Sequence, residues 1–287
     1  MAWYIYAFLG ILFFSVSDQI RRLVLSGKNK IDYYTAAFLI AFMTVLALAI
    51  YVAFAGFIMP PIGSFVPLFM LNVGLAFAGL LTSQKALSLL GVSEFTILMS
   101  SRQIVTLLAS VIFLGIGLSL QQGIGMVLVI SALLVMFLNK RLFQKNKSAA
   151  GMFFAILTAL NYGCSILTDQ LIYRKSDPAS YLIIQLSLIA IMLVLVRPQT
   201  LKGLGLLYSA RHGAQLLLLG SLGAAALVLL FTSLKLADNA PQVGGLFQVS
   251  IIVSVLLATI FLRERKNLFR KAIGTLLGTL GAILIVL

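Results

Sequence analysis

Ten apolar stretches, each about long enough to cross a bilayer as a helix, follow one another along the chain. They lie at about residues 2–25, 32–56, 66–89, 94–114, 120–138, 149–172, 179–197, 213–236, 240–262 and 270–287. The chain also repeats itself at a spacing of roughly 150 residues, because Ser-Asp-Gln-Ile at 17–20 is matched by Thr-Asp-Gln-Leu at 168–171. The predicted fold is therefore an all-α integral membrane protein of ten transmembrane helices, arranged as two inverted five-helix repeats.

Composition supports a membrane protein over a water-soluble one. The 287 residues are 61% hydrophobic and only 10% charged, whereas soluble domains carry about 25% charged residues. We expect a first repeat at residues 1–139 and a second at 149–287, joined by a basic linker at 140–148. Because the chain has one cysteine, Cys164, and one histidine, His212, we expect no disulfide within the chain, no metal or other cofactor, and no enzymatic activity.

The net charge of +14 indicates membrane topology more than nucleic-acid binding, because the basic residues form short clusters between apolar stretches. Connections after odd-numbered stretches hold 17 Lys and Arg residues, and connections on the opposite side hold three. The positive-inside rule then predicts a cytoplasmic linker and both termini outside. The expected location is the cell inner (plasma) membrane.

The end of each half carries a family-like pattern. Residues 258–265 read Ala-Thr-Ile-Phe-Leu-Arg-Glu-Arg and are followed by Ile273-Gly274, while the first half has Phe-Leu-Gly-Ile at 113–116 before Ile124-Gly125. Here the chain resembles the ten-helix, EamA-type members of the drug/metabolite transporter superfamily, over nearly its whole length. Two departures stand out: Ile116 replaces the expected acidic residue, and neither 94–114 nor 240–262 holds the usual central proline.

The resemblance implies a secondary-active transporter that works by alternating access. We expect export of a small polar metabolite of amino acid or amine type, driven without a nucleotide-binding domain. An alternative is exchange of anionic solutes such as sugar phosphates or nucleotide sugars. An alternative of another class is a non-transporting membrane assembly or a lipid-handling protein. The expected partners are a small-molecule substrate and the lipid bilayer, with no nucleic acid.

Charged residues inside apolar stretches are expensive and therefore mark candidate sites. Asp18 and Asp169 each lie near the end of the first helix of a half and are candidates for binding a proton or a cationic substrate group. Arg102 lies in the fourth stretch, where it can pair with Asp18 as an inner gate or bind a carboxylate or phosphate. The structural alternatives are a static Asp18–Arg102 pair, an Asp18–Arg22 pair, and an Asp169–Tyr173 contact.

Uncharged polar residues extend the candidate site. Those expected to face the centre are Asn72, Gln103, Asn161, Tyr162, Ser165, Gln185, Gln248 and Ser250. Among them Asn161, Ser165 and Asp169 share one helix face at i, i+4 and i+8, which predicts a polar cavity. Hydrogen bonds between helices would give the same pattern.

Two further features have less specific explanations. Glu264 lies among Arg263, Arg265 and Lys266, which indicates a cytoplasmic turn that neutralises its own charge. The glycines at 274, 278 and 281 permit close helix approach, which fits either a homodimer or helix packing within one bundle.

Overall fold

The structure is a computed structural model that describes residues 3–26, 31–115, 117–137, 146–173, 177–236, 246–264 and 267–286. These residues form eleven α-helices and two 3-10 helices, and no strand. The α-helices are α1 (Trp3–Leu25), α2 (Tyr33–Ala55), α3 (Val66–Leu89), α4 (Val92–Met99), α5 (Arg102–Leu114), α6 (Leu120–Phe137), α8 (Asn146–Tyr173), α9 (Pro178–Val196), α10 (Ala210–Leu236), α12 (Val249–Phe261) and α13 (Leu268–Val286). The 3-10 helices are η1 (Ile62–Phe65) and η2 (Pro198–Tyr208).

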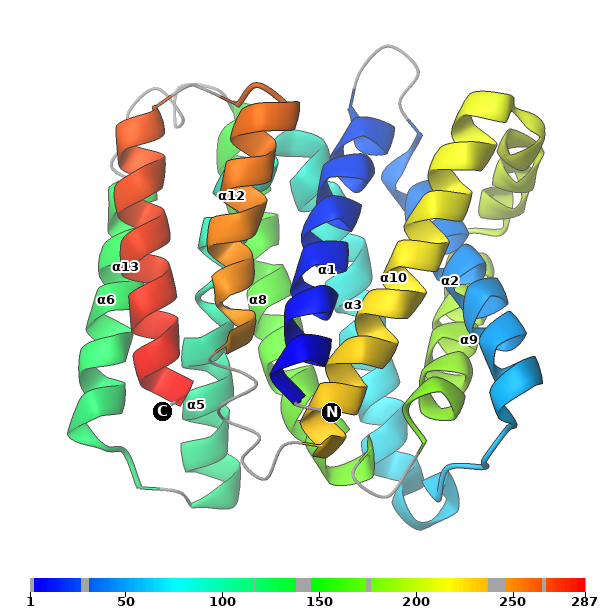
Figure 1. Ribbon diagram of the computed structural model, residues 1–287, viewed down its shortest axis with the longest axis horizontal. Helices are drawn as coiled ribbons and strands as arrows, with labels where there is room; N and C mark the ends of the chain where they lie inside the picture. Colours follow the sequence, from blue (N-terminus) through cyan, green and yellow to red (C-terminus); the bar gives the residue numbers. More distant parts are fainter. Residues whose placement is uncertain are drawn as a thin grey trace.

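The all-helical membrane fold predicted from the sequence is confirmed. Eight of the described segments are long and apolar enough to cross a bilayer, and α4 and α5 together make one of them, Val92–Phe113. The helices α6 and α12 are apolar but shorter. The start of α1 and the end of α13 lie at the same end of the bundle (Figure 1), as the predicted ten crossings require.

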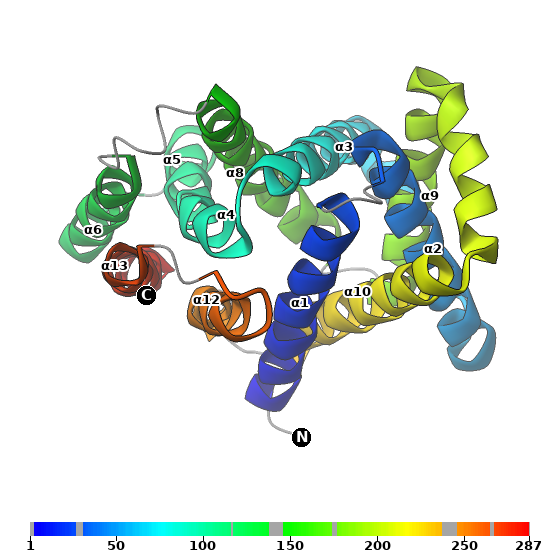
Figure 2. The same cartoon turned by 90° about the horizontal axis from the view of Figure 1, so that it is seen from above.

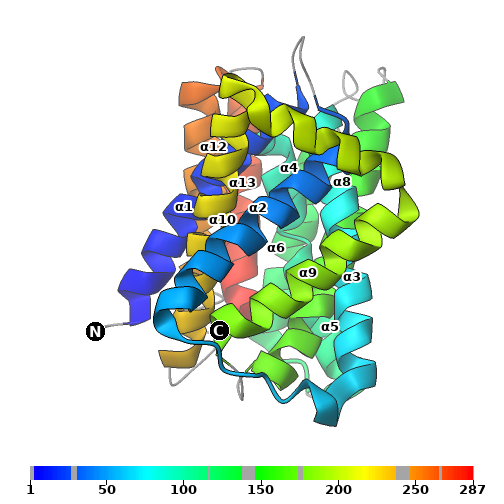
Figure 3. The same ribbon diagram turned by 90° about the vertical axis from the view of Figure 1, so that its right-hand side faces the viewer.

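Helices from the two halves of the chain pack against each other in pairs. Helix α3 packs along α8, α1 along α10, α2 along α9, and α6 along α13. Seen from above, α1, α10, α12 and α13 lie opposite α3, α4, α5 and α8 (Figure 2), while α2 and α9 lie side by side on one side of the bundle (Figure 3). The centre of the protein is therefore bounded by helices of both halves.

Small residues allow the closest of these approaches. A Cβ atom added to Gly125 on α6 would lie 2.6 Å from the carbonyl oxygen of Gly281 on α13, so the two backbones are in direct contact. Gly278 lies close to Ser100 and Ala132 of the same chain. The glycine pattern of the last helix is thus used for helix packing within the chain, and a homodimer remains a prediction.

The fourth apolar stretch differs from the continuous helix expected at 94–114. It is divided by a tight turn at Ser100 and Ser101, whose backbone N–H groups donate to the carbonyls of Ile97 and Leu98 three residues earlier. The two serine hydroxyls donate to the same carbonyls. This polar turn replaces the missing proline as the cause of the break and places Arg102 at the start of α5.

Other boundaries agree with the prediction within a few residues. Helix α8 begins at Asn146, so the end of the expected linker 140–148 is helical, and its first residues lie outside the described residues. The start of the expected 240–262 stretch also lies outside them.

Candidate functional site

Asp169 is held by neutral donors from its own helix and from α9. The Tyr181 hydroxyl donates to Asp169 Oδ1 at 2.7 Å, and the Gln185 side-chain amide approaches the same oxygen at 3.5 Å. Ser165, one turn earlier on α8, donates to Oδ2 at 3.5 Å. The tyrosine seen to contact Asp169 is Tyr181; the alternative of an Asp169–Tyr173 contact stays a prediction, because the Tyr173 side chain lies outside the described part of the structure.

Asn72 on α3 joins this cluster to a third helix. Its amide nitrogen donates to the Thr168 hydroxyl at 2.6 Å and to the Ser165 carbonyl at 3.0 Å. Its amide oxygen accepts from Gln185 and, at 3.3 Å, from Tyr181. Asn72 and Tyr181 are fully buried. We call Asn72, Ser165, Thr168, Asp169, Tyr181 and Gln185 the Asp169 cluster; it fixes α3, α8 and α9 around one carboxylate, with no basic side chain among its members.

Asp18 has a different environment. Its carboxylate forms an ion pair with Arg21 on the same helix at 3.2 Å, and the carboxylate is buried. Arg22, the partner expected at i+4, instead donates to the carbonyl of Leu87 on α3. The Asp18–Arg102 pair is not among the ion pairs between described residues.

Tyr162 on α8 brings these charges into one neighbourhood. Asp18, Arg21 and Arg102 each act electrostatically on its phenol, and the phenol interacts with Ser83. The ring packs on Gly79 of α3, where an added Cβ atom would lie 2.6 Å from Tyr162 Cε1. We call Asp18, Arg21, Arg102 and Tyr162 the Tyr162 cluster. It contains one carboxylate and two guanidinium groups.

The remaining candidates, Asn161, Gln103 and Gln248, are members of neither cluster. Asn161 donates to the carbonyl of Leu157 on its own helix at 2.8 Å, so it satisfies its amide locally. Gln103 and Gln248 are buried next to the two helix starts of α5 and α12. Sequence reasoning missed Tyr181, although Tyr181 and Gln185 form an i, i+4 polar pair in an otherwise apolar helix, which is a usable signal.

Gln84 is a second residue that the sequence did not single out. Its side chain is fully buried, and neither amide atom has a hydrogen-bond partner in the described part of the chain. It follows Ser83, which contacts Tyr162, and lies one turn before Leu87, which accepts from Arg22. A glutamine inside an apolar helix is the signal that could have identified it.

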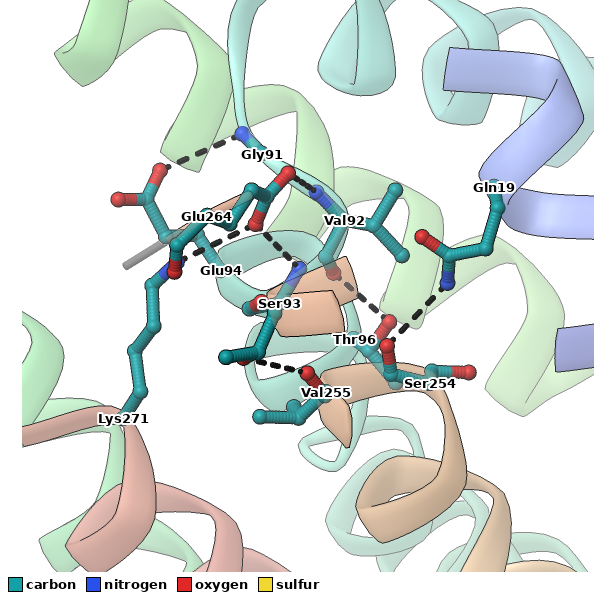
Figure 4. A network of polar contacts seen from close by, with 11 residues as sticks. Gln19, Gly91, Val92, Ser93, Glu94, Thr96, Ser254, Val255, Glu264 and Lys271 are labelled. Carbon is teal, nitrogen blue, oxygen red and sulfur yellow. Dashed lines mark hydrogen bonds and ion pairs between the residues drawn. The ribbon is translucent and has the colours of Figure 1, made fainter. Parts of the chain in front are cut away.

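Glu264 connects the turn after α12 to the start of α4 (Figure 4). Its carboxylate accepts from the backbone N–H groups of Val92 at 2.8 Å and Ser93 at 3.2 Å, and it pairs with Lys271 at 3.2 Å. The charge of Glu264 is thus balanced by Lys271 and by the N-terminus of α4, while Arg265 and Lys266 of the expected self-neutralising turn lie outside the described residues. Burial alone would raise the pKa of Glu264, but Lys271 and these donors outweigh it and leave the pKa below its ordinary value.

Two buried polar clusters inside a helical membrane bundle can hold a proton, an ion or a polar solute. The Asp169 cluster offers one carboxylate among neutral donors, and the Tyr162 cluster offers charges of both signs. No group of three or more His, Cys, Asp or Glu side chains suited to a metal ion occurs in the described residues.

The chain is similar to known proteins in sequence and in fold. Residues 149–287 match the model of the EamA-like transporter family. A solved crystal structure, described only as that of a protein, matches 98% of this chain and 94% of its own chain, with a TM-score of 0.65 and 14% sequence identity. That similarity shows the fold alone, over both halves. No curated protein matches the chain.

Proposed function

Residues 149–287 belong to the EamA-like transporter family, and from this premise we propose that the chain is a secondary-active transporter of a small polar metabolite. Membership of this family makes the protein a multi-pass membrane transporter and not an enzyme. Our proposal adds the mechanism, which is alternating access between two inverted repeats, residues 1–139 and 149–287.

The pairing of helices supports the inverted repeats. The first helix of each half packs along the third helix of the other half, as α1 does with α10 and α3 with α8. The second helices pack together, and so do the fifth. A two-fold axis that relates the halves produces this pattern, because it maps the contact between α1 and α10 onto the contact between α8 and α3.

The observation that carries the proposal is the position of two carboxylates on equivalent helices. Asp18 lies near the end of α1 and Asp169 near the end of α8, and these helices run in opposite directions across the bundle (Figure 1). Asp18 lies within the candidate span Trp3–Leu25 and Asp169 follows the candidate span Ala149–Ile166 on the same helix, and both are held by polar partners. Carboxylates at opposite depths of one bundle suit a pathway that opens to each side in turn.

The charge bias of the connections supports an inner-membrane location with the termini outside. Energy then comes from a proton or ion gradient or from exchange. We propose export of an amino acid or amine as the main activity. Exchange of anionic solutes is the second candidate, and Arg102, whose buried Nε atom has no hydrogen-bond partner among the described residues, favours it.

Flux into proteoliposomes tests the proposal. We expect the wild-type protein to move a labelled amino acid or amine when a proton gradient is imposed, and we expect Asp18→Asn and Asp169→Asn to reduce that flux strongly. Asp32→Asn is the matched control, since Asp32 lies at the exposed start of α2 and pairs with Arg197 there. Normal gradient-driven flux in both Asp18→Asn and Asp169→Asn would remove the carboxylates from the mechanism.

A further inference from the structure

Arg102 places a positive charge at the middle of the membrane-crossing segment Val92–Phe113. Its Nε atom is buried and has no hydrogen-bond partner in the described part of the chain. None of the ion pairs between described residues includes Arg102. Arg102 as a whole is half-buried, and a guanidinium in a membrane-crossing segment without an anion is unfavourable, so the protein holds Arg102 in a position that a negative charge would stabilise.

No described acidic residue is free to supply that charge. The chain has seven Asp and Glu residues, and Asp238 lies outside the described residues. Each of the other six has a different partner: Asp18 has Arg21, Asp32 has Arg197, Glu94 has the Gly91 N–H, Asp169 has Tyr181, Asp177 has Ser180, and Glu264 has Lys271.

The surroundings of Arg102 are net positive. In the Tyr162 cluster one carboxylate, Asp18, is already paired with Arg21, which leaves the charge of Arg102 in excess. One additional negative charge would make the cluster neutral. The missing partner is therefore a singly charged anionic group that is not among the described residues.

We infer that Arg102 binds an anionic oxygen group, a carboxylate or a phosphate, on the molecule that the protein transports. This inference rests on the proposed function and narrows its substrate class to anions and zwitterions such as amino acids, and away from simple amines. The planar guanidinium can donate two parallel hydrogen bonds to such a group. The Tyr162 phenol, whose ring packs against Gly79, is close enough to Arg102 for the two groups to interact electrostatically.

The test compares molecules that differ in one charged group. Thermal unfolding of the purified full-length protein is followed with a set of L-amino acids, each beside its decarboxylated amine and its carboxamide, and with glycerol phosphate beside glycerol. We expect a saturable rise in Tm only with compounds that carry the oxyanion. The amino acid and glycerol phosphate arms then tell a carboxylate from a phosphate site.

Variants at Arg102 connect the response to this side chain. Arg102→Gln should weaken the binding of the anionic compounds by roughly 30-fold or more, because it removes the charge. Arg102→Lys should recover part of the affinity, since it keeps the charge but loses the planar fork. Arg197→Gln is the matched control at an exposed arginine and should leave the response unchanged.

Two results would overturn the inference: an amine or amide that stabilises the wild type as well as its parent acid, or an anion response that survives Arg102→Gln. If Arg102→Gln does not give a folded protein, the wild-type comparison and Arg102→Lys decide. If anions bind in a way that depends on Arg102 but no flux is detected, the proposed transport is refuted and the anion-binding site stands. If the Arg102→Gln variant still transports an amine, the proposed transport stands and the anion-binding role of Arg102 is refuted.

Discussion

The carboxylate of Glu264 accepts a hydrogen bond from the backbone N–H of Val92 at 2.8 Å, although the two residues lie 172 positions apart. Through this contact the turn between α12 and α13 closes the N-terminus of α4. Gly91 leaves room for it, because a Cβ atom there would lie 2.6 Å from Glu264 Oε2. The two halves of the chain are thereby joined at the end of the bundle where α1 also ends (Figure 1).

Replacing Glu264 should destabilise the protein in a pH-dependent way. Glu264→Ala leaves Lys271, whose side chain is 6% exposed, without its anion, at an expected cost of about 3 to 5 kcal/mol. Since the folded-state pKa of Glu264 is lowered, its stabilisation is complete above the ordinary value of 4.5 and is lost as pH falls through the lowered pKa. The difference in Tm between wild type and variant should therefore be large at pH 7 and shrink well below pH 4.5. An equal difference at all pH values would contradict this account.

The position of the Tyr162 ring depends on the absence of a side chain at residue 79. Gly79→Ala should displace the Tyr162 ring and weaken substrate binding, because the added Cβ atom has no space. Gly74→Ala on the same helix is the control, since nothing lies within 4 Å of its added Cβ atom. That change should leave binding intact and stabilise α3 slightly, by about 0.5 to 1 kcal/mol. Equal substrate binding by Gly79→Ala and Gly74→Ala would show that Tyr162 is not part of the substrate site.

Tyr181 provides the shortest hydrogen bond to Asp169. Tyr181→Phe removes this buried donor and should lower stability by about 1 to 3 kcal/mol, together with a loss of flux. Tyr4→Phe is the control, since Tyr4 is 56% exposed. Thermal unfolding and proteoliposome flux check both variants, and unchanged values for Tyr181→Phe would make the Asp169 cluster irrelevant to stability and transport.

Several parts of this arrangement follow from the sequence. Helical periodicity placed Ser165 and Asp169 on one face, and both belong to the Asp169 cluster. The same periodicity included Asn161, whose amide instead bonds to its own helix, because a carbonyl one turn earlier is always within reach. Spacing therefore predicts the face of a helix but not which polar group its side chain reaches.

The partners across helices could not be predicted. Arg21 and Arg22 both lie within reach of Asp18 along one helix, and the choice between them depends on Leu87 of α3, whose carbonyl binds Arg22. Tyr181 approaches Asp169 only because α9 crosses beside α8 and α3. The turn at Ser100 has neither glycine nor proline, so its sequence gave no sign of a helix break.

Membrane orientation is a separate prediction from charge. Three helix ends with basic residues lie at one end of the bundle, opposite the chain termini (Figure 1). They are the end of α1 with Arg21, the end of α3 with Lys85 and the start of α13 with Lys271. A reporter that is active only outside the cytoplasm should work when fused after Leu287 and fail when inserted at Lys145. The reverse pattern would contradict the orientation and leave the fold unaffected.

Accessibility at the two repeated Asp-Gln pairs tests alternating access most directly. In a background with Cys164 replaced, Ser17→Cys and Thr168→Cys are labelled with a membrane-impermeant thiol reagent in intact cells and in inside-out vesicles. We expect Thr168→Cys to react from outside and Ser17→Cys only in inside-out vesicles, both with rates that substrate changes. Labelling of both positions from one side, or of neither in any condition, would contradict a pathway that opens in turn at Asp18 and Asp169.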